Sequence, residues 1–290
     1  MADRSASPIA VITGASSGIG TAAAKALAAE GWQIIGVGRD ETRSAAALAE
    51  IEAVASGPAP SMLRGDLSLL SEAERLAEEI AALTPRLDLL ANNAGGMASE
   101  QRMTREGFEA SFTANFLGPF LLTERLLPLL RKAAKDAPEG AVRIVNTSSS
   151  GSEAIPALDV HDLQGLQNWL PGRAYCGGKL ANVLHARMLA ERLADDGIIA
   201  HAFHPGTVDT NFFAHVAASV RESFRDAPKL SDEEGADTLI WLATAEEAGR
   251  TSGGYWYQRE PRKPNPVVED EAFVRQFWDA SEAMIAKAGF

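Results

Sequence analysis

The chain has 290 residues, of which 46% are hydrophobic and 23% are charged. This composition is typical of a globular protein and excludes a collagen-like, coiled-coil or disordered chain. Lysine and arginine total 27 against 39 acidic residues, which gives a formal net charge of −12 and disfavours a surface for a nucleic-acid backbone. The single cysteine, Cys176, excludes an intrachain disulfide and fits a reducing cytoplasm.

The N-terminal sequence MADRSASP has neither the basic region nor the long apolar stretch of a secretory signal. No segment offers the roughly 18 consecutive apolar residues that a membrane-spanning helix needs. Even the leucine-rich stretch 116–130 is interrupted by Thr123, Glu124 and Arg125. We therefore expect a soluble, cytoplasmic protein that does not associate with a membrane.

Short apolar runs bounded by turn residues predict six β-strands. They are Ile9–Thr13, Gln33–Val37, Met62–Leu63, Leu87–Ala91, Arg143–Thr147 and Ile198–Phe203. Between these strands lie segments whose apolar residues have helical spacing, such as Leu76, Ile80 and Leu83. Because the strands are mostly continuous rather than alternating apolar runs, we expect burial on both faces. The order predicts a doubly wound α/β fold, with a parallel sheet flanked by helices on both faces.

We predict one domain over residues 1–290, because no internal repeat or low-complexity tract divides the chain. The proline-rich segment 259–266 lies too near the end to separate two domains. Two irregular segments, 151–171 and 207–229, follow strand ends. Since ligands of open α/β sheets bind outside the carboxyl ends of the strands, these segments are candidate walls of a substrate site.

A glycine-rich turn follows the first predicted strand and leads into an alanine-rich helix. Such a turn brings backbone N–H groups and the positive end of a helix toward a pyrophosphate. The spacing G-x3-G-x-G differs from the common G-x-G-x-x-G pattern, so a purely structural corner is the alternative. The expected cofactor contacts are Gly14, Ser16, Ser17, Gly18, Ile19 and Gly20.

The second predicted strand ends in Val37-Gly38-Arg39-Asp40. NAD-specific proteins place an acidic side chain near this point to bind the ribose hydroxyls. Gly38 offers none, whereas the planar guanidinium of Arg39 could bind a 2′-phosphate. We therefore expect NADP(H) as the preferred cofactor, with NAD(H) possible. In the alternative interpretation Arg39 is a solvated loop residue and Asp40 caps the next helix.

Lys179 lies four positions after Tyr175, which places a phenol and an ammonium one turn apart on a helix face. A nearby ammonium favours the phenolate and would lower the tyrosine pKa toward values useful for proton transfer. The alternative is a helix surface on which Tyr175 simply packs. A serine run, Ser148 to Ser150, follows the fifth predicted strand and places a hydroxyl where ligands bind.

These motifs, with Asn92-Asn93-Ala94-Gly95 and Asn115 between them, occur in the order typical of the short-chain dehydrogenase/reductases, which the chain resembles. The retinol-dehydrogenase-like branch is the most similar. That similarity is carried by NFLGPFLLT at 115–123, KLANVL at 179–184, HPGTVDT at 204–210, and the C-terminal segments 252–255, 264–266 and 277–282.

The resemblance implies a Rossmann fold of about seven strands and an NAD(P)-dependent oxidoreductase acting on a carbonyl or alcohol carbon. It implies Tyr175 as general acid/base, Lys179 on the nicotinamide ribose, Ser149 on the substrate oxygen and Asn115 in a water relay. Homodimers would form through helices 116–130 and 175–193. The further cofactor contacts that it implies are Asp66, Leu67, Asn93, Ala94, Gly95, Pro205, Gly206 and Val208.

Three further features leave alternatives open. Asp66 could instead cap a helix that begins near Leu69. Pro119 has no N–H for the carbonyl of Asn115, so we expect this carbonyl to accept a bond from a relay water, the alternative being an ordinary helix kink. A non-catalytic dinucleotide sensor or scaffold on the same fold is the competing function.

The substrate side contains two groups of apolar residues that could line a pocket for an apolar substrate. Packing of short helices explains the same pattern. The histidines have no ligand spacing, so we expect no metal. The two apolar groups are Leu158, Leu163, Leu166, Trp169 and Leu170, and Phe212, Phe213, Val216, Val220 and Phe224.

Overall fold

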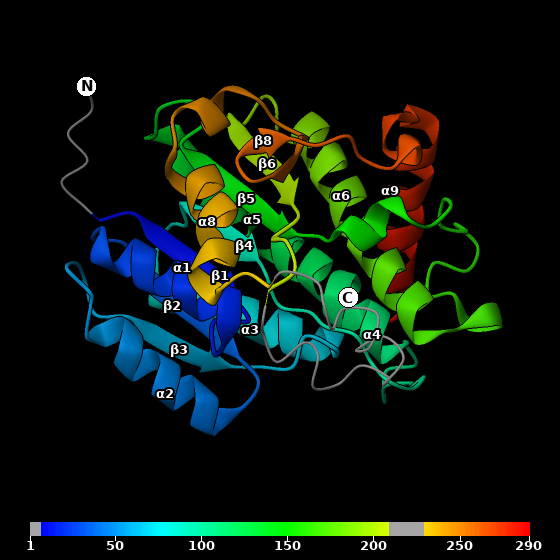
Figure 1. Cartoon of the computed structure of the whole chain (residues 1–290), viewed down its shortest axis with the longest axis horizontal. Helices are drawn as coiled ribbons and strands as arrows, with labels where there is room; N and C mark the ends of the chain where they lie inside the picture. The colour runs from blue at the N-terminus through cyan, green and yellow to red at the C-terminus, as the bar shows by residue number, and fades with distance from the viewer. Residues whose placement is uncertain (1–6, 209–228) are drawn as a thin grey trace.

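The computed structural model describes residues 7–208 and 229–290. Within them, eight strands form one sheet in the order β3-β2-β1-β4-β5-β6-β7-β8 (Figure 1). The first seven strands are parallel, and β8 pairs antiparallel with β7. The strands are β1 (Ile9–Thr13), β2 (Gln33–Gly38), β3 (Ser61–Arg64), β4 (Leu89–Asn92), β5 (Val142–Thr147), β6 (Ile198–Phe203), β7 (Tyr255–Tyr257) and β8 (Glu260–Pro261).

The predicted doubly wound fold is confirmed, and helices cover both faces of the sheet (Figure 1). One face carries α1 (Gly18–Ala29), α2 (Glu41–Glu52) and α8 (Asp232–Thr244). The other carries α3 (Leu70–Leu83), α5 (Gly118–Lys135) and α6 (Pro171–Arg192), with α9 (Glu271–Lys287) packed against α6. Short elements are α4 (Ala110–Phe112), the π-turn η1 (Thr113–Leu117), and the 3-10 turns η2 (Ser150–Glu153), η3 (Leu166–Asn168), η5 (Glu247–Arg250) and η6 (Pro266–Glu269).

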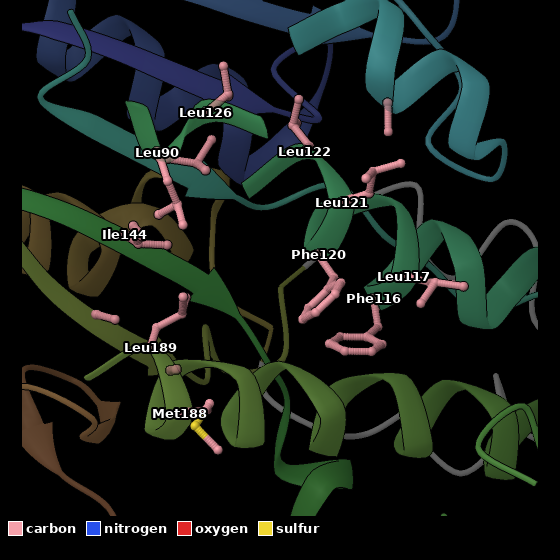
Figure 2. Close-up of a cluster of buried hydrophobic side chains, with 14 of the residues drawn as sticks. Leu90, Phe116, Leu117, Phe120, Leu121, Leu122, Leu126, Ile144, Met188 and Leu189 are labelled. Atoms are coloured by element: carbon pink, nitrogen blue, oxygen red, sulfur yellow. The ribbon is translucent and has the colours of Figure 1, made fainter. Parts of the chain in front are cut away.

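The apolar strands bury both of their faces, as their continuous hydrophobic runs predict. In β1, Ala10 and Ile12 face the α1 and α8 side, whereas Val11 faces the α3, α5 and α6 side. Figure 2 shows η1 and α5 filling the core on the α3, α5 and α6 side, with Phe116 of η1 beside Phe120 of α5. Their ring centroids are 5.5 Å apart. No helix among residues 7–208 and 229–290 combines the length and apolarity needed to cross a membrane.

A buried polar network crosses the core between β4, β5, α5 and α6. Asn92 donates from Nδ2 to Thr123 Oγ1 at 2.9 Å and to Asn146 Oδ1 at 3.0 Å. Asn146 in turn donates to the Asn182 carbonyl at 3.1 Å and lies 3.3 Å from His185 Nδ1. These side chains are almost fully buried, so each bond replaces one to water and holds the elements in register.

His185 lies at the end of this network among Phe116, Phe120 and Trp278. Burial, helped by the charge of Arg192, lowers its pKa to about 3. The ring is therefore neutral in the folded protein at pH values where the unfolded chain is already protonated. Since the unfolded state binds the extra proton, stability falls as the pH drops from about 6.5 toward 3.

Replacing His185 with glutamine should therefore flatten the acid limb of the stability curve. Below pH 6.5 the free energy of unfolding of the wild type should fall by about 1.4 kcal/mol per pH unit more than that of the variant. Urea unfolding at pH 6.5 and pH 5 measures this difference. His161→Gln, which changes an exposed histidine, is the matched control. Parallel pH dependences for wild type and His185→Gln would contradict the prediction.

Candidate active site

The glycine turn between β1 and α1 has a backbone geometry and close packing that require glycine. Gly14 and Gly18 have φ of +71° and +59°, a backbone conformation that favours glycine. A methyl group on Gly20 would lie only 2.3 Å from the Gly14 carbonyl oxygen. The N-cap residue Ser17 makes no side-chain capping bond, so it leaves the first-turn N–H groups of α1 uncapped. This cradle fits the pyrophosphate of a dinucleotide.

Hydrogen bonds tie this turn to the ends of β4 and β5. Thr13 Oγ1 accepts bonds from the N–H groups of Asn93 and Ala94 at 2.9 and 3.0 Å. Asn93 Nδ2 donates to the Thr13 carbonyl at 3.0 Å, and Thr147 Oγ1 donates to Asn93 Oδ1 at 3.1 Å. Sequence reasoning missed both threonines. The position of Thr13, immediately before the glycine turn, could have indicated its role. Nothing in the sequence around Thr147 indicated that residue's role.

Arg39 lies exposed at the end of β2 and lines an open cavity of about 520 Å³. Arg64, Gly65, Asp66, Glu72 and Arg75 complete the lining. Arg75 is paired with Glu72, and Arg64 lies 3.5 Å from Glu41. No side chain among the described residues pairs with Arg39. The cavity thus brings Arg39 and Asp66, both expected cofactor contacts, to one site.

Two neighbouring acids cap or brace the backbone. Asp40 caps α2 by accepting the N–H of Arg43 at 2.9 Å, as the alternative interpretation of this segment predicted. The suggestion that Asp66 caps the next helix is wrong: its Oδ1 accepts the Ser68 N–H at 3.0 Å, before α3 starts at Leu70. Glu106, distant in sequence, caps α3 by accepting the N–H groups of Leu70 and Ser71 at 2.6 and 3.1 Å.

Lys179 is buried with its ammonium bound to a strand-end carbonyl. Its Nζ donates to the Thr147 carbonyl oxygen at 3.0 Å, and Asn182 Nδ2 donates to the same oxygen at 3.1 Å. Ser148 Oγ donates to the Lys179 carbonyl at 2.7 Å, which fixes α6 against the end of β5. Burial lowers the pKa of Lys179 to about 8.

The side chains of Asn115 and Lys179 both lie next to Gly95. A methyl group on Gly95 would lie 2.5 Å from Asn115 Oδ1 and 3.0 Å from Lys179 Nζ, so only glycine fits between them. The Asn115 amide donates to the Gly96 and Ser111 carbonyls, each at 2.8 Å, and its Oδ1 accepts the Gly96 N–H at 3.1 Å.

The helix containing Asn115 has a π-turn instead of a simple kink. The Gly118 N–H bonds to the Thr113 carbonyl five residues earlier, and α5 begins at Gly118 with Pro119 in its first turn. A methyl group on Gly118 would lie 2.1 Å from the Leu67 carbonyl oxygen, so this turn also presses against the expected adenine-binding segment. The water bond expected at the Asn115 carbonyl stays a prediction.

Tyr175 and Ser149 lie together at the end of β5. A side-chain interaction with Ser149 acts to lower the pKa of Tyr175, and Lys179 Nζ lies 5.7 Å from the centroid of the Tyr175 ring. The expected lowering of the tyrosine pKa is not found. Burial raises the pKa of Tyr175 to about 12 and outweighs the interaction with Ser149, which acts in the opposite direction.

The segment after β6 brings Val208 close to Ile19 at the start of α1, with Gly235 of α8 between them. Gly206 has φ of +88°, and a methyl group there would lie 2.5 Å from Leu230. Val208 pairs with Leu230, and a methyl group on Gly235 of α8 would contact both Val208 and Ile19 at 2.6 and 3.1 Å.

Part of the expected substrate side lies outside the described residues. This includes Phe212, Phe213, Val216, Val220 and Phe224. In the other segment, 151–171, Leu163 is buried, whereas Leu166 and Leu170 are 38% and 62% exposed. The described residues contain no group of three His, Cys, Asp or Glu side chains arranged to hold a metal ion.

Comparisons with known proteins agree with this geometry. The model of the family described as short chain dehydrogenase matches residues 8–220. The chain is 36% identical over 277 residues to DnrU of Streptomyces sp. (strain C5), provisionally named a daunorubicin C-13 ketoreductase, covering 95% of this chain and 91% of that protein. It is 34% identical to polyprenol dehydrogenase of Mus musculus, with 93% and 81% covered. It is 33% identical to retinol dehydrogenase 11 of Mus musculus, with 94% and 84% covered.

Solved structures show the same fold. The complex of Pseudomonas aeruginosa RhlG with NADP superposes with a TM-score of 0.69 at 27% identity, covering 87% of this chain and 94% of that chain. An uncharacterised protein from Mycobacterium Paratuberculosis gives a TM-score of 0.74 at 27% identity, with 96% and 93% covered. The chain therefore belongs to the short chain dehydrogenase family, in its retinol-dehydrogenase-like branch, and is an oxidoreductase that uses a nicotinamide dinucleotide.

Proposed function

We propose that this protein is an NADP(H)-preferring enzyme that reduces a carbonyl, or oxidises the matching alcohol, on an apolar substrate. The observation that carries the proposal is the convergence of Ser149, Tyr175, Lys179 and Asn115 beside the glycine turn. A bound nicotinamide would supply the hydride. Side chains of this protein would bind the substrate oxygen and transfer the proton.

Ser149 and Tyr175 would share the substrate oxygen. The Ser149 hydroxyl can hold the carbonyl oxygen, and the Tyr175 hydroxyl can donate its proton to that oxygen as negative charge develops on it. With a pKa near 12, Tyr175 is protonated at neutral pH. The phenol therefore carries the proton that carbonyl reduction requires.

The Lys179 ammonium would supply a positive charge near the Tyr175 phenol and a proton to replace the one that Tyr175 donates. A pKa near 8 leaves most of the ammonium protonated at pH 7 yet able to release a proton more readily than an exposed lysine. Asn115 binds the Gly96 backbone, and its Oδ1 lies with this ammonium beside Gly95, which supports a role in keeping the proton path aligned.

The substrate class is supported by the names of the relatives. A ketoreductase for daunorubicin, a polyprenol dehydrogenase and a retinol dehydrogenase all act, by name, on large molecules with extended apolar parts. The exposed Leu166 and Leu170 lie in the segment expected to form one wall of the substrate site, where an apolar substrate would find partners.

Tyr175→Phe should abolish most of the turnover while leaving cofactor binding intact. Loss of the proton donor should lower kcat by about 10²- to 10⁴-fold, because general acid catalysis contributes about that much. NADPH oxidation with a panel of hydrophobic aldehydes and ketones measures kcat, and NADPH fluorescence measures binding. Full turnover in the variant would exclude Tyr175 as the donor. Cofactor binding by the wild type without any turnover would favour a sensor.

Arg39→Asp should shift the cofactor preference toward NADH. The substitution removes a cation without a partner among the described residues and places an acid where a 2′-phosphate would bind. The Kd for NADPH should rise about tenfold or more, while that for NADH changes little. Arg275→Asp on α9 makes the same change in net charge at an exposed position and is the control. Equal losses for both cofactors would refute the assignment.

A further inference from the structure

A carboxylate four residues beyond Ser149 is bound by the C-terminal part of the chain. Glu153, the last residue of η2, accepts two bonds from Arg262, from Nε to Oε1 at 2.6 Å and from Nη2 to Oε2 at 2.9 Å. The Tyr255 hydroxyl also donates to Glu153 Oε1, at 3.0 Å. Both partners are about 30% exposed, so this fork-like pair is better shielded from water than a surface ion pair.

The same arginine is joined to the segment on the other side of the site. Its guanidinium lies 5.3 Å from the centroid of the Tyr257 ring, and Tyr257 stacks on His204 with centroids 5.0 Å apart. Burial lowers the pKa of His204 to about 4, which leaves the ring neutral at pH 7. Its Nδ1 can then accept the Gly206 N–H, 3.3 Å away. The β7–β8 hairpin thus contacts both the turn after β5 and the segment after β6.

The η2 turn lies directly against the helix that carries Tyr175. A methyl group on Gly151 would lie 2.7 Å from Cys176 Sγ, and the Gly151 N–H donates to Ser149 Oγ at 3.2 Å. Asn265, buried at the start of η6, donates to the Ser152 and Ile155 carbonyls at 3.2 and 2.7 Å. A shift of η2 would therefore move the Ser149 hydroxyl relative to Tyr175.

We propose that Arg262 and Glu153 are positioning residues that set the distance between Ser149 and Tyr175 by holding η2 against the β7–β8 hairpin. This role rests on the proposed function. Neither residue belongs to the expected cofactor contacts or to the proposed proton-transfer group, so we expect them to affect kcat through geometry and to leave cofactor binding by the glycine turn unchanged. Small displacements of a reacting group are costly, so loss of the pair should be visible in turnover.

Glu153→Gln and Arg262→Lys test this role. The first keeps the size of the side chain but removes its charge, and the second keeps the charge but loses the two-pronged geometry. Each should lower kcat about tenfold, with the Kd for NADPH within about twofold of the wild type. Hydrogen exchange in the peptide covering residues 149–155 should become faster in both. Circular dichroism establishes that the variants are folded.

Asp237→Asn is the matched control, because Asp237 pairs with Arg259 of the same hairpin but attaches it to α8 instead of η2. It should leave both kcat and exchange at 149–155 unchanged. Unchanged exchange in Glu153→Gln would overturn the inference whatever the activity. Faster exchange with unchanged kcat would equally overturn it, since the pair would then be merely structural. Absence of turnover in the wild type, by contrast, would refute the proposed function itself, and this role with it.

Discussion

Burial of one ammonium group is the constraint around which the candidate site is arranged. Lys179 is almost fully buried, and an ammonium without a hydrogen-bond partner in that position would be strongly destabilising. The Thr147 carbonyl supplies the partner at the end of β5. Ser148 and Asn182 then fix α6 against the strand end, so the lysine and the carbonyl keep their separation.

The same ammonium determines what its neighbours can be. Gly95 must lack a side chain because Asn115 and Lys179 occupy the space beside it. Asn115 reaches this position because the π-turn inserts an extra residue before α5. Burial moves the pKa of Tyr175 up and that of Lys179 down, so both groups are pushed toward their neutral forms. A protonated phenol next to a readily deprotonated ammonium is a pair suited to delivering a proton and replacing it.

Sequence reasoning predicted the features that depend on local pattern. Apolar runs predicted six strands within about two residues of their ends, because strands buried on both faces leave an unambiguous signature. Strands β7 and β8 were not among them, since three and two residues are too short for a periodic pattern. Each predicted cofactor residue lies at the carboxyl end of the sheet, where the order of strands and helices requires it to lie.

Features set by distant contacts could not be predicted in this way. The Thr147 carbonyl is a backbone atom and has no signature in the sequence. Glu106 caps a helix 35 residues earlier in the chain, and Arg262 binds Glu153 from 109 residues away. The direction of the Tyr175 pKa was also mispredicted, because spacing on a helix does not reveal burial, which is the largest cause of the raised pKa.

The pKa of Lys179 tests most directly whether the site is built around a buried ammonium. Carbon-13 labelling of the lysine side chains and NMR titration from pH 6 to 11 would follow each ammonium, and Lys179→Met would assign the resonance. One resonance, missing in the variant, should titrate near pH 8. Titration of Lys179 with the exposed lysines, near its ordinary value of 10.5, would contradict the buried-ammonium site.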